Sequence, residues 1–191
     1  MRNFIKLFLY RLSGKVGKAM SREVNSFVIG DASKCVGCRA CEVACFKAHS
    51  NREESSKPIF VKGKRRDIIT RIHVVKNEKF SVPVQCRQCE DAPCANACPV
   101  GAIKEKEHVL VVEEELCIGC KACVMACPFG AIEVKRKSEE VRKVAYKCDL
   151  CRNRDTKACV EICSKKALKL FDPVKERKQR NIDTVNNLID D

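Results

Sequence analysis

Sixteen cysteines constrain this 191-residue chain more than any other feature, because they form four runs of four with none left over. The runs are Cys35, Cys38, Cys41 and Cys45; Cys86, Cys89, Cys94 and Cys98; Cys117, Cys120, Cys123 and Cys127; and Cys148, Cys151, Cys159 and Cys163. Thiolates from one short, folded-back stretch can converge on a single iron–sulfur cubane. The third run also has the spacing of bacterial ferredoxins, including a proline after its fourth cysteine. The spacing therefore predicts four 4Fe–4S clusters, if every cysteine is a ligand.

Two other uses of cysteine fit the pattern less well. Disulfide frameworks are typical of short secreted domains, whereas this chain shows no secretory signal, so we expect free thiols in a reducing cytoplasm. Structural zinc sites usually consist of two separated cysteine pairs rather than three closely spaced cysteines and a fourth. A zinc-binding scaffold is kept as a minor alternative, and the longer gap in the last run suits it best.

Repetition indicates which runs belong together. The first and third runs share one motif with a glycine before the second cysteine, which indicates duplication of a unit. In two-cluster ferredoxins the fourth cysteine of each run ligates the cluster of the other run. Cys98 lies only 19 residues before Cys117, and both middle runs continue as Cys-Pro-x-Gly-Ala-Ile. We therefore expect the two middle runs to pair.

The outer runs then pair across the middle ones, although the 21 residues from Cys127 to Cys148 leave a sequential arrangement open. With crossed fourth ligands, the expected sets are Cys35, Cys38, Cys41 and Cys163 for cluster one; Cys86, Cys89, Cys94 and Cys127 for cluster two; Cys117, Cys120, Cys123 and Cys98 for cluster three; and Cys148, Cys151, Cys159 and Cys45 for cluster four.

The local pattern predicts short helices and strands around the cysteines. In each run the third and fourth cysteines are four residues apart, which places both on one face of a short helix. Short β-rich stretches are expected at 27–29, 71–75, 79–84, 108–112 and 131–134. Gly37 and Gly119 allow the backbone to bend closely around inorganic sulfide.

From residue 27 to about residue 170 the chain resembles a known family. The segments that carry the likeness are Asp-Ala-Ser-Lys-Cys at 31–35, Arg-Ile-His-Val-Val at 71–75, the second cysteine run with its flanks at 86–99, and Tyr-Lys-Cys-Asp-Leu-Cys at 146–151. They are similar to the four-cluster ferredoxin-type subunits of the dimethyl-sulfoxide-reductase iron–sulfur family. Within it, the formate hydrogenlyase, formate dehydrogenase and hydrogen-dependent CO2 reductase branch is the most similar. Phe46 and Ser164 depart from the pattern, where a proline could follow the fourth cysteine.

The resemblance implies an α+β fold of two bacterial-ferredoxin-like ββα modules, each holding two 4Fe–4S clusters, with the middle module inserted in the outer one and helices at the termini. The expected parts are a basic amphipathic extension at 1–24, an outer module at 25–80 and 142–171, an inner module at 81–141, and a charged C-terminal tail at 172–191. Residues 50–66 are expected to form an exposed loop.

The N-terminal extension has Ile5, Leu9, Leu12 and Val16 at helical spacing. Its apolar run is too short to span a bilayer, so residues 1–20 are expected to dock on a partner, with peripheral contact to a membrane surface as the alternative. Translation starting near Met20 or Val24 is a further alternative.

The charge balance does not require nucleic acid as a partner. The chain has 38 Lys and Arg against 25 Asp and Glu, a formal charge of +13. Four thiolates around a cubane leave about −2 per cluster, so four clusters offset roughly 8 of these charges. The basic residues are also not interleaved with aromatic ones, and we expect no nucleic-acid binding.

No catalytic motif is present, and His49, His73 and His108 are scattered, which favours structural roles for them. The resemblance implies a non-catalytic subunit that passes single electrons between catalytic redox subunits, with formate dehydrogenase and hydrogenase as the expected partners and further ferredoxin-like subunits beside them. It would lie in the cytoplasm, with the inner membrane face as an option. A free-standing polyferredoxin carrier or a maturation accessory is the alternative.

We predict that removal of iron unfolds the chain. Aromatic residues make up 5% of the sequence and tryptophan is absent, so the clusters must supply much of the cohesion. Treatment with an iron chelator under argon should abolish most of the far-ultraviolet circular dichroism. An iron-free chain that keeps a cooperative thermal transition at the original midpoint would contradict this.

Overall fold

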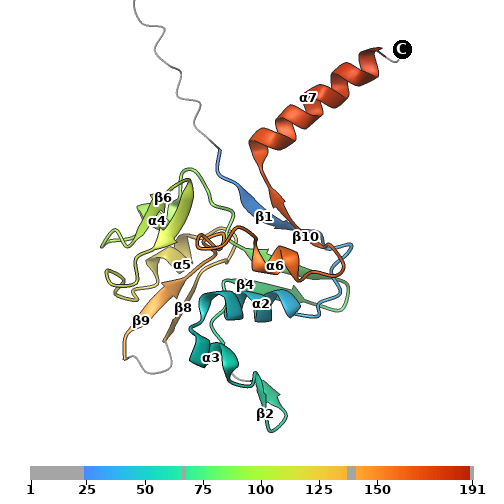
Figure 1. Ribbon diagram of the computed structural model, residues 1–191. Coiled ribbons are helices and arrows are strands. Elements are labelled where there is room, and N and C mark those ends of the chain that lie inside the picture. Colours follow the sequence, from blue (N-terminus) through green and yellow to red (C-terminus); the bar gives the residue numbers. More distant parts are fainter. Residues whose placement is uncertain (1–23, 66–67, 137–140, 190–191) are drawn as a thin grey trace, which may run out of the picture.

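A computed structural model describes residues 24–65, 68–136 and 141–189, so the expected helix at 1–20 lies outside the described residues. The described chain is a mixture of short strands and short helices (Figure 1). The helices are α2 (Ala40–His49), α3 (Arg52–Ser56), α4 (Pro93–Asn96), α5 (Ala122–Ala126), α6 (Ala158–Glu161) and α7 (Pro173–Ile189). The strands are β1 (Phe27–Gly30), β2 (Phe60–Val61), β3 (Lys64–Arg65), β4 (Ile72–Lys76), β5 (Ser81–Gln85), β6 (Ile103–Lys106), β7 (Val109–Val112), β8 (Glu133–Arg136), β9 (Lys143–Tyr146) and β10 (Leu168–Phe171).

The strands pair in twos. Within the described residues they form five antiparallel pairs, β1–β10, β2–β3, β4–β5, β6–β7 and β8–β9. Four of these pairs are local hairpins or short connections, whereas β1–β10 joins the start of the described chain to its end. Phe27 lies opposite Phe171 in that pair, with ring centroids 5.1 Å apart.

The long-range strand pair brings the first and fourth cysteine runs together. Helix α2 of the first run packs against α6 of the fourth. One hydrophobic core lies here, and it buries Val28, Ile72, Leu150 and Leu168 together with cysteines of both runs. The two outer runs therefore share one core although more than one hundred residues separate them.

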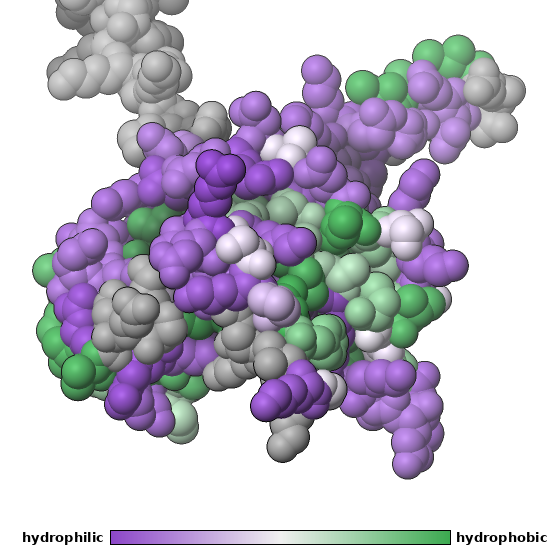
Figure 2. Space-filling view, turned by 60° about the horizontal axis from the view of Figure 1, so that its bottom comes forward, coloured by the Kyte–Doolittle hydropathy of each residue, from purple (hydrophilic) through white to green (hydrophobic). Residues whose placement is uncertain are grey.

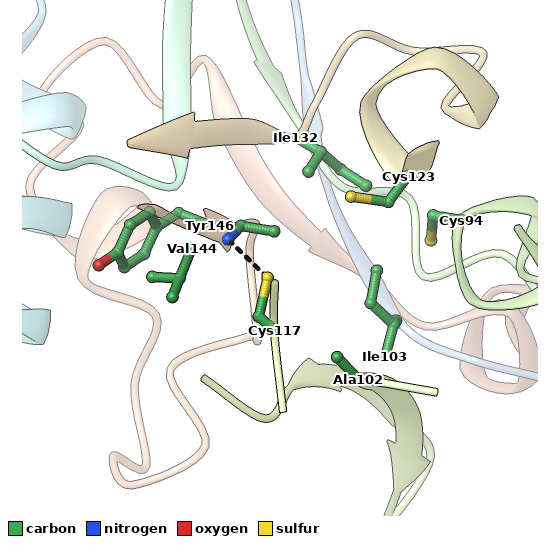
Figure 3. Packing of buried hydrophobic residues seen from close by; sticks show 9 residues of the cluster. Cys94, Ala102, Ile103, Cys117, Cys123, Ile132, Val144 and Tyr146 are labelled. Carbon is green, nitrogen blue, oxygen red and sulfur yellow. Dashed lines mark hydrogen bonds between the residues drawn. The ribbon is translucent and has the colours of Figure 1, made fainter. Parts of the chain in front are cut away.

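The second and third runs share a separate core. Helix α4 packs against α5 and against β6, which pairs with β7. Figure 3 shows Cys94, Cys117 and Cys123 among Ala102, Ile103 and Ile132, which all belong to the buried residues of this core. Each pair of cysteine runs thus has its own set of apolar neighbours.

The prediction that the third and fourth cysteines share a helix face is correct for α2 and wrong for the other three runs. Cys127 is the C-terminal cap of α5, and Cys98 and Cys163 lie two residues beyond α4 and α6. Pro99 and Pro128 explain two of these ends, because the residue before a proline is pushed out of the helical region. Cys127 accordingly has an extended ψ of 113°.

The five expected β-rich stretches correspond to strands β1, β4, β5, β7 and β8. The start and the end of each strand differ from the expected bounds by no more than two residues. The segment 50–66 is more ordered than the expected loop. It contains α3, whose cap Asn51 accepts a hydrogen bond from the backbone N–H of Glu54 at 2.7 Å. It also contains the β2–β3 hairpin, in which Lys62 and Gly63 both have positive φ, as a two-residue turn requires.

The charged tail forms α7, which projects from the body of the molecule (Figure 1). Asp172 begins the helix, and its Oδ1 accepts hydrogen bonds from the backbone N–H groups of Val174 and Lys175. The apolar side chains of Leu188 and Ile189 are exposed near its end, where Figure 2 shows a hydrophobic tip. No helix in the described parts of the chain is long and apolar enough to cross a membrane.

We predict that Gly119 is needed for packing as well as for its backbone conformation. It has a φ of +69°, and an added Cβ would lie 2.6 Å from the carbonyl oxygen of Lys143. Gly119→Ala should therefore destabilise the cluster-loaded chain by about 2–4 kcal/mol, from left-handed strain and overpacking together.

Gly101 is the matched control for this change, because it has a φ of +60° but no atom near the position of an added Cβ. Gly101→Ala should cost about 1 kcal/mol, from conformation alone. The two thermal midpoints measured by circular dichroism should differ accordingly, and equal losses in the two variants would refute the packing role of Gly119.

Candidate metal-cluster sites

Two hollows in the structure are each lined by four cysteines. One is lined by Cys35, Cys38 and Cys41 of the first run and by Cys163 of the fourth. The other is lined by Cys117, Cys120 and Cys123 of the third run and by Cys98 of the second. In both cases three cysteines of one run meet the fourth cysteine of another. Among the described residues, no three His, Cys, Asp or Glu side chains are spaced for a single metal ion.

The remaining cysteines influence one another in the same crossed manner. Burial raises the pKa of Cys94 to about 11, and Cys86 and Cys127 are among the neighbours that raise it. Burial also raises the pKa of Cys159 to about 12, and the thiols of Cys45 and Cys151 add to this. Cys127 therefore lies near the second run, and Cys45 lies near the fourth.

Buried thiols with raised pKa values are suited to a bound metal. Burial raises the pKa of Cys41 to about 12 and also raises that of Cys148, because an isolated thiolate loses its hydration there. A metal cluster removes this penalty, since coordination replaces the proton with iron. Soft thiolate donors in sets of four also match the ligand preference of iron–sulfur clusters.

Backbone N–H groups donate to the fourth cysteine of every run. The sulfurs of Cys98, Cys127 and Cys163 each accept a hydrogen bond from the residue four positions later, at 3.2, 3.5 and 3.3 Å. This geometry is possible because the helix ends before the cysteine and the chain turns back.

In the first run α2 continues past Cys45, and the donor comes from another segment. The N–H of Arg71 lies 3.3 Å from the Cys45 sulfur. Donors of this kind stabilise thiolate charge and raise the reduction potential of a bound cluster. The helix ends that the sequence pattern mispredicted therefore have a role in the site.

Left-handed residues shape the loops that carry the cysteines. Arg39 and Lys121 directly follow the second cysteines of their runs, precede α2 and α5, and have φ values of 61° and 67°. Ala92 precedes α4 with a φ of 36°. Only the glycines of these loops were identified from the sequence, because non-glycine residues with positive φ leave no compositional signal.

A half-buried carboxylate, that of Asp149, joins two other segments of the chain through His49 and Arg71. His49 Nε2 donates to Asp149 Oδ1 at 2.9 Å, and His49 Nδ1 donates to the carbonyl oxygen of Cys45 at 2.8 Å. Arg71 pairs with the other oxygen of Asp149. Burial by itself lowers the pKa of His49, but the hydrogen bonds with Asp149, Cys151 and Cys45 outweigh it and raise the value to about 12.

The expected structural role for the histidines agrees with these contacts. His49 links α2 to the fourth cysteine run through Asp149, whose N-terminal neighbour is Cys148. His73 Nδ1 lies 3.6 Å from Glu133, and His108 Nδ1 lies 3.8 Å from Glu105. Neither of these two lines the cysteine hollows.

Gln88 connects the second and fourth cysteine runs and was not identified from the sequence. It is 1% exposed, its Nε2 donates to the carbonyl oxygen of Cys148 at 2.8 Å, and its Oε1 accepts from the N–H of Leu110 at 2.9 Å. Its own N–H lies 3.4 Å from the sulfur of Cys86. One buried amide thus contacts the second run, the fourth run and β7.

Comparison with known proteins identifies 4Fe–4S domains over the cysteine runs. Residues 77–172 match the family described as 4Fe-4S dicluster domain, and residues 32–45 match one described as 4Fe-4S binding domain. The electron transport protein HydN of Escherichia coli strain K12 is 45% identical over 157 residues, which cover 76% of this chain and 87% of that protein. An iron-sulfur protein of Rhodospirillum rubrum is 40% identical over 162 residues, which cover 78% of this chain and 83% of that protein. Formate hydrogenlyase subunit 2 of Escherichia coli strain K12 is 36% identical over 180 residues, which cover 78% of this chain and 83% of that protein.

The two family matches together contain all four cysteine runs. The sixteen cysteines fit four 4Fe–4S clusters, and the relatives include a protein named for electron transport. The chain therefore belongs to the 4Fe–4S dicluster family and is an electron-transfer iron–sulfur protein of mixed helix and strand structure.

Proposed function

We propose that this chain is a non-catalytic subunit that carries single electrons between the catalytic subunits of a redox complex. The observation that carries the proposal is the convergence of three cysteines of one run with the fourth cysteine of another, in two hollows. Each bound cluster would accept and release one electron. With four thiolate ligands per cluster, no iron site stays open for a substrate, so the chemistry belongs to the partners.

The proposed ligand sets are those expected from the spacing. Cys35, Cys38, Cys41 and Cys163, and likewise Cys98, Cys117, Cys120 and Cys123, line one hollow each. The mutual effects on thiol pKa support Cys127 with Cys86, Cys89 and Cys94, and Cys45 with Cys148, Cys151 and Cys159.

The proposed architecture is an inner module at 81–141 inserted in an outer module at 25–80 and 142–171. The β1–β10 pair and the packing of α2 on α6 support the outer module, and the packing of α4 on α5 supports the inner one. The boundary near residue 142 does not separate the two modules completely, because β9 at 143–146 pairs with β8 of the inner module. This shared sheet would join the two modules rigidly.

The exposed cysteines suggest where electrons enter and leave. Cys38 and Cys120 are exposed, whereas every cysteine of the second and fourth runs is buried or half-buried. Val36 and Ile118 lie two residues before Cys38 and Cys120, and their exposed fractions are 57% and 61%. An apolar contact next to an exposed ligand would let a partner approach the cluster closely and exclude water from the path.

The proposed partners are formate dehydrogenase and hydrogenase, with further ferredoxin-like subunits. The likeness to formate hydrogenlyase subunit 2 supports this choice. We place the complex in the cytoplasm or at the inner face of the membrane, the latter through residues 1–20. A free-standing polyferredoxin carrier, a maturation accessory and a zinc scaffold are the alternatives that the experiments below separate.

We predict that the full chain, tagged and purified under argon from its own cells, retains catalytic redox subunits in about equimolar amount. Mass spectrometry should identify a formate dehydrogenase or hydrogenase, and formate should drive hydrogen formation by the complex. A brown chain that elutes alone would instead indicate a free carrier or accessory. A colourless chain that contains zinc would indicate a scaffold.

We predict that the apolar contact beside Cys120 is part of the electron exit. Ile118→Glu should slow electron transfer to the partner by about tenfold or more, because a charge would be desolvated in the contact. Val75→Glu is the control, since Val75 is similarly exposed at 50% but lies on β4. Stopped-flow absorbance of the clusters measures the rate, and equal rates for the two variants would argue against docking at Ile118.

A further inference from the structure

Lys147 is a charged residue in the interior of the protein. It follows β9, directly precedes Cys148, and is 2% exposed. Its Nζ donates to the carbonyl oxygens of Leu110 and Cys148, the second at 2.9 Å. Within the described residues it forms no ion pair with a carboxylate. Burying an ammonium group that has only neutral oxygen partners costs folding free energy unless a negatively charged group lies near it.

The hydrogen bonds around Lys147 lead to two cysteine runs. Leu110 lies in β7, and its N–H donates to Gln88. Gln88 and Lys147 both donate to the carbonyl oxygen of Cys148, and the N–H of Gln88 reaches the sulfur of Cys86. The ammonium therefore lies between the second cysteine run and the fourth.

The charge of Lys147 acts on cysteines of the second run. Burial raises the pKa of Cys94, and Lys147 is the largest influence in the opposite direction. Lys147 also lowers the pKa of Cys89, again against the effect of burial. Gln88 contacts the sulfur of Cys86 and the carbonyl oxygen of Cys148, so the two runs approach each other closely at this point.

A cluster with four thiolates carries about −2 charges when oxidised and one more when reduced. Two such clusters on either side of Lys147 would supply the negative charge that its burial requires. In return, a fixed cation in a low-dielectric interior favours the reduced state of each cluster, because the added electron is attracted to it.

We propose that Lys147 is a shared counter-charge that raises the reduction potentials of clusters two and four and so promotes electron transfer between the inner and outer modules. In that step one electron leaves one of the two clusters, which is oxidised, and reduces the other, and no proton moves. Lys147 is not among the proposed ligands, and its Nζ donates to backbone carbonyl oxygens, so it is a positioning residue. The inference rests on the proposed ligand sets.

Three substitutions separate the charge of Lys147 from its packing. Lys147→Gln keeps a hydrogen-bond donor without charge, Lys147→Met keeps the length of the side chain without charge, and Lys147→Arg keeps the charge. Lys178→Gln is the matched control, because Lys178 is exposed on α7, which projects away from both cores. Each full-length variant is purified under argon, and its iron and acid-labile sulfide are determined first.

Redox titration monitored by electron paramagnetic resonance then gives the four midpoint potentials. In Lys147→Gln and Lys147→Met we expect two of the four potentials to shift downward, with the other two unchanged. Lys147→Arg and Lys178→Gln should keep all four near the wild-type values. Fully loaded uncharged variants with four unchanged potentials would overturn the inference and leave Lys147 a structural donor.

The iron content distinguishes the remaining outcomes. Loss of iron in both uncharged variants but not in Lys147→Arg would support a counter-charge that is already needed when the clusters bind. Loss of iron in all three would show a packing role alone and would overturn the inference. A wild-type chain with iron for fewer than four clusters would contradict the four-cluster assignment itself, whatever the variants do.

Discussion

The convergence of cysteines from runs that are far apart in the sequence is the constraint on which the rest of the structure depends. Cys163 can reach the hollow of the first run only if the end of the chain returns to its start, and the β1–β10 pair accomplishes this return. Closing so long a loop has an entropic cost that two short strands could hardly offset alone. Clusters that bridge distant runs would add the missing cohesion, as metals do in other small domains.

The helix ends follow from the same requirement. A fourth cysteine just beyond a short helix can turn toward a neighbouring run while its sulfur accepts an N–H from four residues later, as at Cys98, Cys127 and Cys163. In α2 the helix continues, and the N–H of Arg71 replaces that donor. Two different backbone arrangements therefore provide the N–H donor to the sulfur of the fourth cysteine.

The sequence was informative wherever spacing along the chain determines the chemistry. Two of the four cysteine groups expected from the spacing line one hollow each, and β-rich stretches predicted β1, β4, β5, β7 and β8. Strand β6 was missed because Lys104, Glu105 and Lys106 give it a polar sequence, and only its pairing with β7 makes it a strand.

The buried polar residues were harder to anticipate. Gln88 and Lys147 have side chains that are usually exposed, and their burial depends on contacts between segments distant in sequence. Neither has a local pattern that marks it. They lie between the two cores, where the two pairs of cysteine runs meet, and their contacts indicate that the junction is polar and organised rather than a simple apolar seam.

The central claim is that three cysteines of one run and the fourth of another hold each cluster. It is tested most directly by an anomalous difference map at the iron absorption edge, from crystals of the full chain purified under argon. We expect four iron peaks, each surrounded by such a crossed set. Four peaks that each lie within a single cysteine run, or fewer than four iron peaks, would contradict the claim.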